Sequence, residues 1–281
     1  MAGRDRARIV AAWFDESADR AEREIVPLLA PLAADFIAYA RPEPSDTVLD
    51  AGTGTGLVAR LIAPHVRRVV GLDVSARSLA LARQILPLDR STVVQGTVED
   101  APFRGRAFSL VAASFGLNAT EPSRALGAIR RCLAPGGRLV LQEWGPADAA
   151  SQAIDDLLAD HAVDEPDASL AALRAAPDAL GPLWRDYLQD VDDYREWLEE
   201  AGFAVVDAVE AAPVAIRATP DVFLRYLLVP TFRRREVEAM VPAVRSAFLA
   251  AARARLTQDA QPDGSLIWRP VVLRARAKWA G

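Results

Sequence analysis

The sequence predicts an α/β fold: a Rossmann-like, seven-stranded, mostly parallel sheet with helices on both faces and with helical cap insertions. Three observations lead to this prediction. Short β-rich runs alternate with helical patterns through the middle of the chain, as in parallel strands joined by crossover helices. A glycine-rich turn follows the first of these runs. Late in the chain, apolar segments with helical spacing interrupt the alternation.

Seven segments have the composition of strands. The first is an apolar run that ends in an aspartate, and the fourth is continuously apolar, as expected of a strand that is buried on both faces. In chain order the predicted strands are 47–51, 67–73, 91–96, 108–114, 138–144, 203–211 and 263–278, the last one after a turn.

Helical patterns connect these strands. Ser75 has the position of an N-cap for the helix after the second strand, and the sequence APGG ends the helix before the fifth. Pro242 predicts a kink in the last helix. The predicted helices are 56–66, 75–86, 122–133, 191–202, 219–228 and 235–256.

The chain is expected to form a single domain of residues 1–281. Residues 1–41 are predicted to be a helical N-terminal extension that acts as a lid. Two insertions, 146–186 and 217–262, are apolar and helical. We expect both insertions to cap the site where the second substrate binds.

The composition excludes several classes of function. The formal net charge is −5, whereas binding to a nucleic-acid backbone requires a basic face. The arginine run 233–235 is interpreted as a solvated helix start. The single cysteine, Cys132, excludes an internal disulfide and a cysteine-rich metal site, so we expect a buried thiol and no metal.

The location and assembly of the protein follow only in outline. No run of about 18 apolar residues is present, so we expect no membrane span. The N-terminus lacks the apolar core of a signal peptide, and a cytoplasmic location is expected. A homodimer is compatible with the sequence.

The glycine-rich turn is the strongest candidate for a binding site. Gly52, Gly54 and Gly56 stand between a strand and a helix, where a backbone without Cβ atoms lets a ligand approach closely. Asp73 ends the next strand, and a carboxylate there suits the hydroxyls of a ribose. These features favour an adenosine-containing ligand over a turn needed only for packing. The frame that ends in Ala59 also fits the dinucleotide fingerprint, so the turn alone leaves the cofactor open.

Four segments between residues 47 and 144 resemble the motifs of class I S-adenosylmethionine-dependent methyltransferases. VLDAGTGTG resembles the D-x-G-x-G-x-G loop, and VVQGTVEDAPF resembles the segment around the adenine. SFGLNAT resembles the turn after the fourth strand, and CLAPGGRLVLQEW the start of the fifth. Within this class the segments look most like the ubiquinone/menaquinone C-methyltransferases and their type-11 relatives. A dehydrogenase is not expected to carry the last three.

The resemblance implies S-adenosylmethionine as the cofactor and suggests roles for individual residues. Asp50 would orient the methionine amino group, directly or through water. Asp73 would bind the ribose hydroxyls, and Ser114 would lie near the sulfonium. The residues implied to contact the cofactor are Asp50, Gly52, Thr53, Gly54, Gly56, Asp73, Val74, Thr97, Val98, Glu99 and Ser114.

Thr97 departs from the family pattern, which usually has an aspartate at the adenine edge. The threonine hydroxyl can accept a hydrogen bond from the adenine amino group, but it carries no charge. Glu99 or Asp100 can compensate for the missing carboxylate.

Methyl transfer from a sulfonium requires alignment and a dry pocket, and it requires a base only if the acceptor must lose a proton. His161, in the first insertion, is the best candidate for a catalytic base, with a solvated helix histidine as the alternative. His65 is interpreted as a surface or packing residue. Trp144, at the end of the fifth strand, lines the acceptor pocket or belongs to the core.

The first helix carries three residues of interest for a lid. Trp13, Phe14 and Asp15 either cover the cofactor or belong to an amphipathic face that packs its aromatic side chains. The sequence pattern is compatible with both interpretations.

The predicted function is S-adenosylmethionine-dependent methyl transfer to a small, hydrophobic molecule at carbon or oxygen. The apolar insertions favour such an acceptor, and the sequence lacks the D/N-P-P-Y/F tetrapeptide of enzymes that methylate base or amide nitrogens. The acidic chain argues against RNA. Two alternatives stay open: a cofactor-binding scaffold with a non-methylating or structural role, and an NAD-dependent dehydrogenase.

Overall fold

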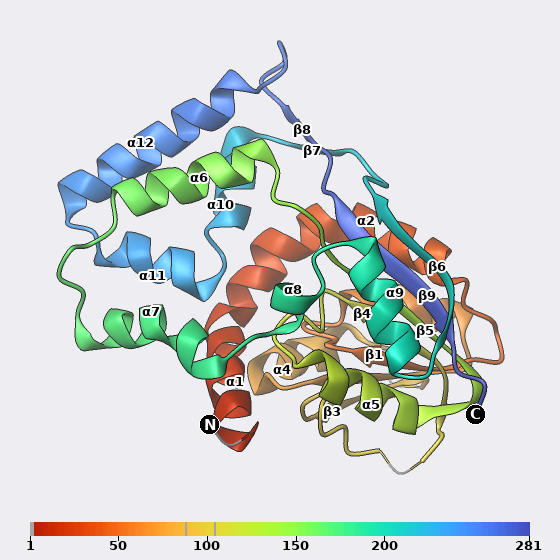
Figure 1. Cartoon of the computed structure of the whole chain (residues 1–281). Helices are drawn as coiled ribbons and strands as arrows, with labels where there is room; N and C mark the ends of the chain where they lie inside the picture. Colours follow the sequence, from red (N-terminus) through yellow and green to blue (C-terminus); the bar gives the residue numbers. More distant parts are fainter. Residues whose placement is uncertain (1–2, 88, 104) are drawn as a thin grey trace.

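Seven strands form the predicted central sheet in a computed structural model that describes residues 3–87, 89–103 and 105–281. They are β1 Thr47–Ala51, β2 Arg68–Asp73, β3 Ser91–Gln95, β4 Phe108–Ser114, β5 Leu133–Trp144, β6 Ala204–Ala211 and β9 Val272–Lys278. Their order is β3-β2-β1-β4-β5-β9-β6 (Figure 1). The first five run parallel, and β9 lies antiparallel between β5 and β6.

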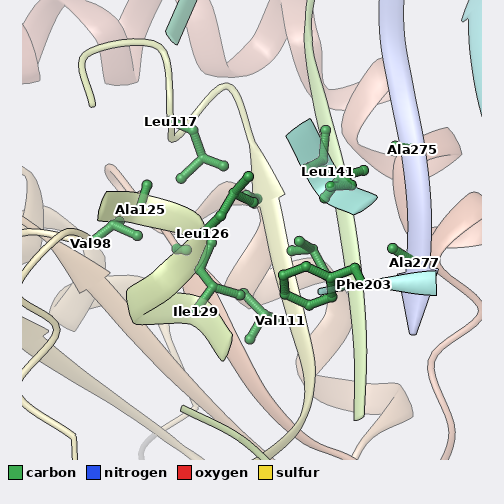
Figure 2. Packing of buried hydrophobic residues seen from close by; sticks show 14 of the residues in the cluster. Val98, Val111, Leu117, Ala125, Leu126, Ile129, Leu141, Phe203, Ala275 and Ala277 are labelled. Carbon is green, nitrogen blue, oxygen red and sulfur yellow. The ribbon is translucent and has the colours of Figure 1, made fainter. Parts of the chain in front are cut away.

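Helices cover both faces of this sheet, as predicted. They are α2 Val26–Ala40, α3 Leu57–Ile62, α4 Ala76–Ile85, α5 Pro122–Cys132 and α9 Val191–Glu200. Buried apolar residues of α2, α3 and α4 pack on one face, and those of α5 and α9 pack on the other. On the second face, Leu126 and Ile129 of α5 lie beside Val111 and Phe203 (Figure 2).

The two insertions form a helical cap. Its helices are α6 Ala149–Asp160, α7 Ala168–Leu180, α10 Pro220–Leu227, α11 Thr231–Ala239 and α12 Pro242–Gln258. The short helix α8 Trp184–Tyr187 follows α7, but its Trp184 packs in the core between the sheet, α5 and α9. In Figure 1, α6, α10, α11 and α12 gather to one side of the sheet, close to the N-terminal helices. Phe223, Phe248 and Trp268 belong to a separate apolar core that the cap shares with Leu28 and Leu32 of α2.

The N-terminal extension is helical, as predicted. It consists of α1 Gly3–Arg20, a π-helical turn η1 Ala21–Ile25, and α2. Arg41 ends α2 in the left-handed conformation, with φ of 49°. The π turn separates α1, which lies near the cap, from α2, which packs on the sheet.

The predicted last strand, 263–278, is wrong as a single element. It consists of β8 Leu266–Trp268 and β9, and Pro270 lies between them without a backbone N–H to donate to a ladder. β8 pairs with β7 Ile216–Ala218, which has no counterpart among the predicted strands.

The predicted helix 235–256 is also two helices. α11 already begins at Thr231, and Val241 is extended, with ψ of 151°. A residue before proline disfavours the helical region, so the chain breaks there and Pro242 becomes the first residue of α12 instead of a kink.

The interpretation of the arginine run as solvated is wrong for its central residue. Arg234 is 7% exposed and forms ion pairs with Glu16 of α1 and Glu238 of α11. This guanidinium therefore joins the N-terminal helix to the cap. Cys132 is buried, as predicted.

Candidate active site

The glycine-rich turn between β1 and α3 is tied to the end of β2. The amides of Gly52 and Thr53 donate to the Leu72 carbonyl oxygen at 2.8 and 3.0 Å. The three glycines have φ of 77° at Gly52, 54° at Gly54 and 92° at Gly56, a region in which side chains are strained. The backbone conformation alone therefore favours glycine at each position.

The three glycines differ in their surroundings. A Cβ atom on Gly52 would lie 2.3 Å from the Cα of Gly116, so the turn after β4 crosses the glycine turn in direct backbone contact. A Cβ on Gly56 would lie 3.2 Å from the Cβ of Ala82 in α4. A Cβ on Gly54 would have no described atom within 4 Å. Gly54 is thus the glycine that borders open space.

Asp50 lies beneath the turn. Asp50 is 1% exposed, and its carboxylate accepts a hydrogen bond from the Thr53 hydroxyl at 2.7 Å. Burial raises the pKa of Asp50 to about 7, although the hydrogen bond from Thr53 acts in the opposite direction. Asp50 therefore holds the turn in place from below.

Asp73 ends β2 and faces the same turn. Its carboxylate accepts hydrogen bonds from the amides of Gly54 and Ser75, each at 2.8 Å. Burial raises its pKa, and these amide hydrogen bonds lower it. A carboxylate has about four lone-pair positions, so Asp73 keeps the capacity to accept a hydrogen bond from a ligand hydroxyl. Together with the open space at Gly54, this arrangement fits an adenosine ligand.

The three residues expected at the adenine edge face different surroundings. Val98 is buried in the core under α5. Thr97 is half-buried, and its hydroxyl oxygen accepts a hydrogen bond from the Asp100 amide at 3.2 Å. Glu99 is buried, and its carboxylate accepts a hydrogen bond from the Glu121 amide at 2.8 Å. Thr97 is therefore the most accessible of the three.

Ser114 ends β4 beside the crossing of the two turns. Its hydroxyl oxygen accepts a hydrogen bond from the Gln142 side-chain amide at 2.7 Å. A hydroxyl that accepts in this way still has its own hydrogen to donate. The next residue, Phe115, has φ of 58°, which turns the chain sharply out of the strand.

An aromatic cluster extends from this point into the cap. Phe115 stacks on Trp144 at 4.0 Å between ring centroids, and Trp144 lies 6.0 Å from Trp268 of β8. Phe223 and Tyr226 of α10 lie 5.1 and 5.2 Å from Trp268. Trp144 is 36% exposed, so one end of the cluster is accessible. We call these five residues the aromatic cluster.

Two further predicted residues do not join the site. His161 caps the end of α6, with its Nδ1 2.8 Å from the Leu157 carbonyl oxygen and its ring against Phe248. Twelve residues of α6, roughly 18 Å at 1.5 Å per residue, separate His161 from Asp148. In Figure 1 this end of α6 points away from the sheet. His65 is exposed, as expected.

Glu143 is a buried carboxyl next to the site that the sequence analysis did not single out. It is 4% exposed, and its Oε1 accepts a hydrogen bond from the Leu117 amide at 2.9 Å. Its Oε2 has no hydrogen-bond partner among the described residues, and burial raises its pKa to about 8. Glu143 thus positions the turn after β4. Glu143 belongs to the segment CLAPGGRLVLQEW, and the resemblance of this segment to the family motif was a signal that could have identified it.

The first helix packs beside the segment that follows Asp73. Trp13 and Val74, the residue after Asp73, belong to the same small apolar cluster. Asp15 accepts a hydrogen bond from the Ser75 hydroxyl at 2.7 Å, whereas Phe14 is 40% exposed. Of the three residues considered for a lid, two therefore contact the segment after β2 and one does not pack inward.

Comparisons with known proteins agree with this geometry. Residues 49–141 match the model of the family described as "Methyltransferase domain". A demethylmenaquinone methyltransferase of Clavibacter sepedonicus is 31% identical over 173 residues, which are 59% of this chain and 69% of that protein. A ubiquinone/menaquinone biosynthesis C-methyltransferase of Xylella fastidiosa is 36% identical over 123 residues, 41% of this chain and 48% of that protein. The match thus spans less than half of the second relative.

Solved structures share the fold. A Bacillus halodurans C-125 protein provisionally assigned as a methyltransferase is 20% identical, with a TM-score of 0.55, over 88% of this chain and 97% of that one. The Haemonchus contortus phosphoethanolamine N-methyltransferase 2 is 15% identical, with a TM-score of 0.53, over 95% of this chain and 60% of that one. Similarity at this level shows that the chain shares its fold with these two proteins.

Within residues 3–87, 89–103 and 105–281, no helix is long and apolar enough to cross a membrane. The same ranges contain no group of three or more side chains arranged to hold a metal ion.

The strand order, the open glycine turn with Asp73, and the similarity over 173 residues lead to one conclusion: the chain belongs to the family of S-adenosylmethionine-dependent methyltransferases.

Proposed function

We propose that the enzyme methylates a small, hydrophobic and planar molecule at carbon or oxygen. The observation that carries this proposal is the aromatic cluster, which begins at the ends of β4 and β5 and continues into the cap. Aromatic side chains with one accessible end suit a flat apolar ligand, which can stack on them. Ser114 lies directly before the cluster in the chain, with a hydroxyl hydrogen free to donate.

The proposal includes roles for the cofactor-site residues. S-adenosylmethionine supplies a methyl group on a sulfonium, which becomes a neutral thioether when the methyl leaves. Asp73 binds the ribose, Val74 and Thr97 lie beside the adenine, and Gly54 leaves room for the cofactor to pass. Asp50 acts from beneath by fixing the turn, since its buried carboxylate accepts the hydrogen bond from Thr53.

The helical additions are proposed to enclose the acceptor. The cap, 146–186 and 217–262, covers the aromatic cluster, and the extension, 1–41, covers the adenosine side. Such an enclosure excludes water, which favours a reaction that neutralises charge. No side chain is assigned as a base, because His161 packs on Phe248 at the far end of α6.

Transfer of a radiolabelled methyl group from S-adenosylmethionine tests this proposal. The acceptors are 2-naphthol, as a planar hydrophobic probe, and unfractionated tRNA. We expect label in the naphthol, and we expect Trp144→Ala to lower kcat/KM at least about ten-fold because the stacking surface is lost. Phe232→Ala, which removes an exposed aromatic ring of the cap, is the matched control and should not change the rate. Label in tRNA alone would contradict the proposal.

A further inference from the structure

A chain of buried polar side chains leads inward from Ser114. Gln142 is fully buried, and its carbonyl oxygen accepts a hydrogen bond from Nε of Arg274 at 2.9 Å. Arg274 is 4% exposed, and its Nη1 donates to Asp35 of α2 at 2.6 Å. The Tyr39 ring lies 5.2 Å from the guanidinium carbon. Asp35 and Tyr39 are the ionisable side chains for which contacts with this guanidinium are described.

One nitrogen of this guanidinium is left over. Nη2 of Arg274 is buried and has no hydrogen-bond partner among residues 3–87, 89–103 and 105–281. A buried donor without a partner is destabilising, more so when it is charged, and native proteins rarely leave one. The guanidinium fork is planar and rigid, and Nη2 lies on its Nε edge, whereas Nη1 lies on the Cδ side. One N–H of Nη2 therefore lies on the same edge of the guanidinium as the Nε–H that donates to Gln142.

The sheet register places Arg274 close to the strand position that carries Trp144 of the aromatic cluster. Ser114, Gln142 and Arg274 are neighbours across β4, β5 and β9. Trp144 pairs with Val272, two residues further along the same strands. Residues two apart in a strand project to the same face and are separated by roughly 6.6 Å. Ser114, Gln142 and Arg274 thus lie on the same face of the sheet as Trp144, and they form a mostly buried polar patch beside the aromatic cluster.

We propose that Arg274 is a specificity-determining residue whose Nη2 binds an ionisable oxygen of the acceptor, such as a phenol or an enol. The inference rests on the proposed function and narrows its acceptor class. The positive charge favours the deprotonated oxygen, and the electron density of that oxygen activates it or a conjugated carbon toward a methyl electrophile. A planar acceptor without such an oxygen would stack on the aromatic cluster but leave Nη2 unpaired.

Binding of two matched probes tests this inference without turnover. 2-Naphthol has the ionisable oxygen, and 2-methoxynaphthalene has the same rings without the proton. Both are titrated into the protein saturated with S-adenosylhomocysteine. We expect the wild type to lower the pKa of bound 2-naphthol by at least about one unit, seen as the naphtholate absorption band at lower pH. We expect Arg274→Met to abolish this shift and to leave 2-methoxynaphthalene binding within about two-fold.

Arg276→Met is the matched control. It removes an arginine two residues along β9, whose guanidinium is occupied by Asp207, and it should retain the naphthol shift. Arg274→Lys provides a second variant if the Met variant does not fold. We expect its single ammonium group to remain with Asp35, and we expect this variant to lose the pKa shift of bound 2-naphthol as well.

The outcomes separate the inference from the proposed function. An unshifted naphthol pKa in the wild type, or a shift that persists in the Arg274 variants, overturns the assignment while stacking of both probes still supports an aromatic acceptor. If S-adenosylhomocysteine binds and neither naphthalene does, the proposed acceptor class is wrong, and the assignment of Arg274 falls with it.

Discussion

Gly52 and Gly54 are two residues apart in one turn, yet their neighbours differ. Gly52 touches the backbone of Gly116, whereas Gly54 borders open space. Both have positive φ, so both favour glycine for backbone reasons. Gly52 therefore serves the packing of two turns, and we propose that Gly54 serves the approach of a ligand.

Alanine at each position should separate these two roles. Gly52→Ala places a Cβ 2.3 Å from Gly116, and we expect it to lower the free energy of unfolding by roughly 3 kcal/mol. Gly54→Ala adds only backbone strain, about 1 kcal/mol, but should weaken S-adenosylhomocysteine binding at least about ten-fold. Denaturant titration and calorimetry measure the two effects. Equal loss of stability in both variants would contradict the distinction.

Glu143 makes stability depend on pH in a defined direction. Its pKa is raised to about 8 in the folded protein, so the fold favours the protonated form. The resulting stabilisation is complete below the unfolded pKa, near 4.3, and is lost as the pH rises through 8. Asp50, with a pKa of about 7, acts in the same direction over a narrower range.

The Glu143→Gln substitution tests this linkage. Each such group contributes a slope of about −1.4 kcal/mol per pH unit to the free energy of unfolding between the two pKa values. Between pH 5 and 8, we expect the free energy of unfolding of Glu143→Gln to fall less steeply than that of the wild type, by about 1.4 kcal/mol per pH unit. The exposed Glu200→Gln is the control. Parallel pH profiles for the wild type and Glu143→Gln would show that the carboxyl is not linked to folding.

The sequence supports many of the site residues but not their contacts. Asp73 and Gly54 were predictable because motif spacing places both at the carboxyl edge of parallel strands. The hydrogen bond that Asp50 accepts from Thr53 beneath the turn was not predictable, since it depends on the direction of one side chain. Arg274 lies in the last strand, and only pairing of that strand with β5 brings it to Gln142.

At the scale of elements, α1 acts as a strap. Asp15 accepts hydrogen bonds from the Ser75 hydroxyl and the Arg77 amide at the start of α4. On its other side, Glu16 pairs with Arg234 of α11. The same helix thus contacts the segment beside Asp73 and the cap. The π turn that follows α1 is a common position for functional irregularity in helices.

Removal of the Asp15 carboxylate should loosen this strap. A side-chain contact with the N-terminus of a helix, as Asp15 makes with α4, stabilises by about 0.5–2 kcal/mol. We therefore expect Asp15→Ala to speed the dissociation of S-adenosylhomocysteine up to about ten-fold. Stopped-flow displacement measures the rate. Asp89→Ala, in an exposed ion pair elsewhere, is the control. An unchanged rate in Asp15→Ala would mean that α1 does not retain the cofactor.

The elements also show where local patterns stop being informative. The parallel strands were predictable because each contains an apolar or β-branched run, which is continuous in β4. β7 was not, since it has three residues and exists through pairing with β8, far along the chain. The break before Pro242 follows a local rule, yet the apolar spacing of α11 and α12 continues across it and hides the boundary.

At the scale of the whole molecule, the chain combines a cofactor-binding sheet with a cap that has its own core. The glycine turn and Asp73 belong to the sheet. In the aromatic cluster, Phe223 and Tyr226 belong to the cap, and Trp268 of β8 packs against them. This division explains why the four motifs identify the family but not the acceptor. The homodimer and the cytoplasmic location stay predictions.

Calorimetric titration of S-adenosylhomocysteine and of NAD into the wild type and Asp73→Ala tests the central claim most directly. We predict that the wild type binds S-adenosylhomocysteine and not NAD, because the turn and Asp73 form one adenosine site of a methyltransferase. Asp73→Ala should weaken that binding at least about thirty-fold, while the surface variant Asp156→Ala should not. Binding of NAD alone, or unchanged S-adenosylhomocysteine affinity in Asp73→Ala, would contradict the account.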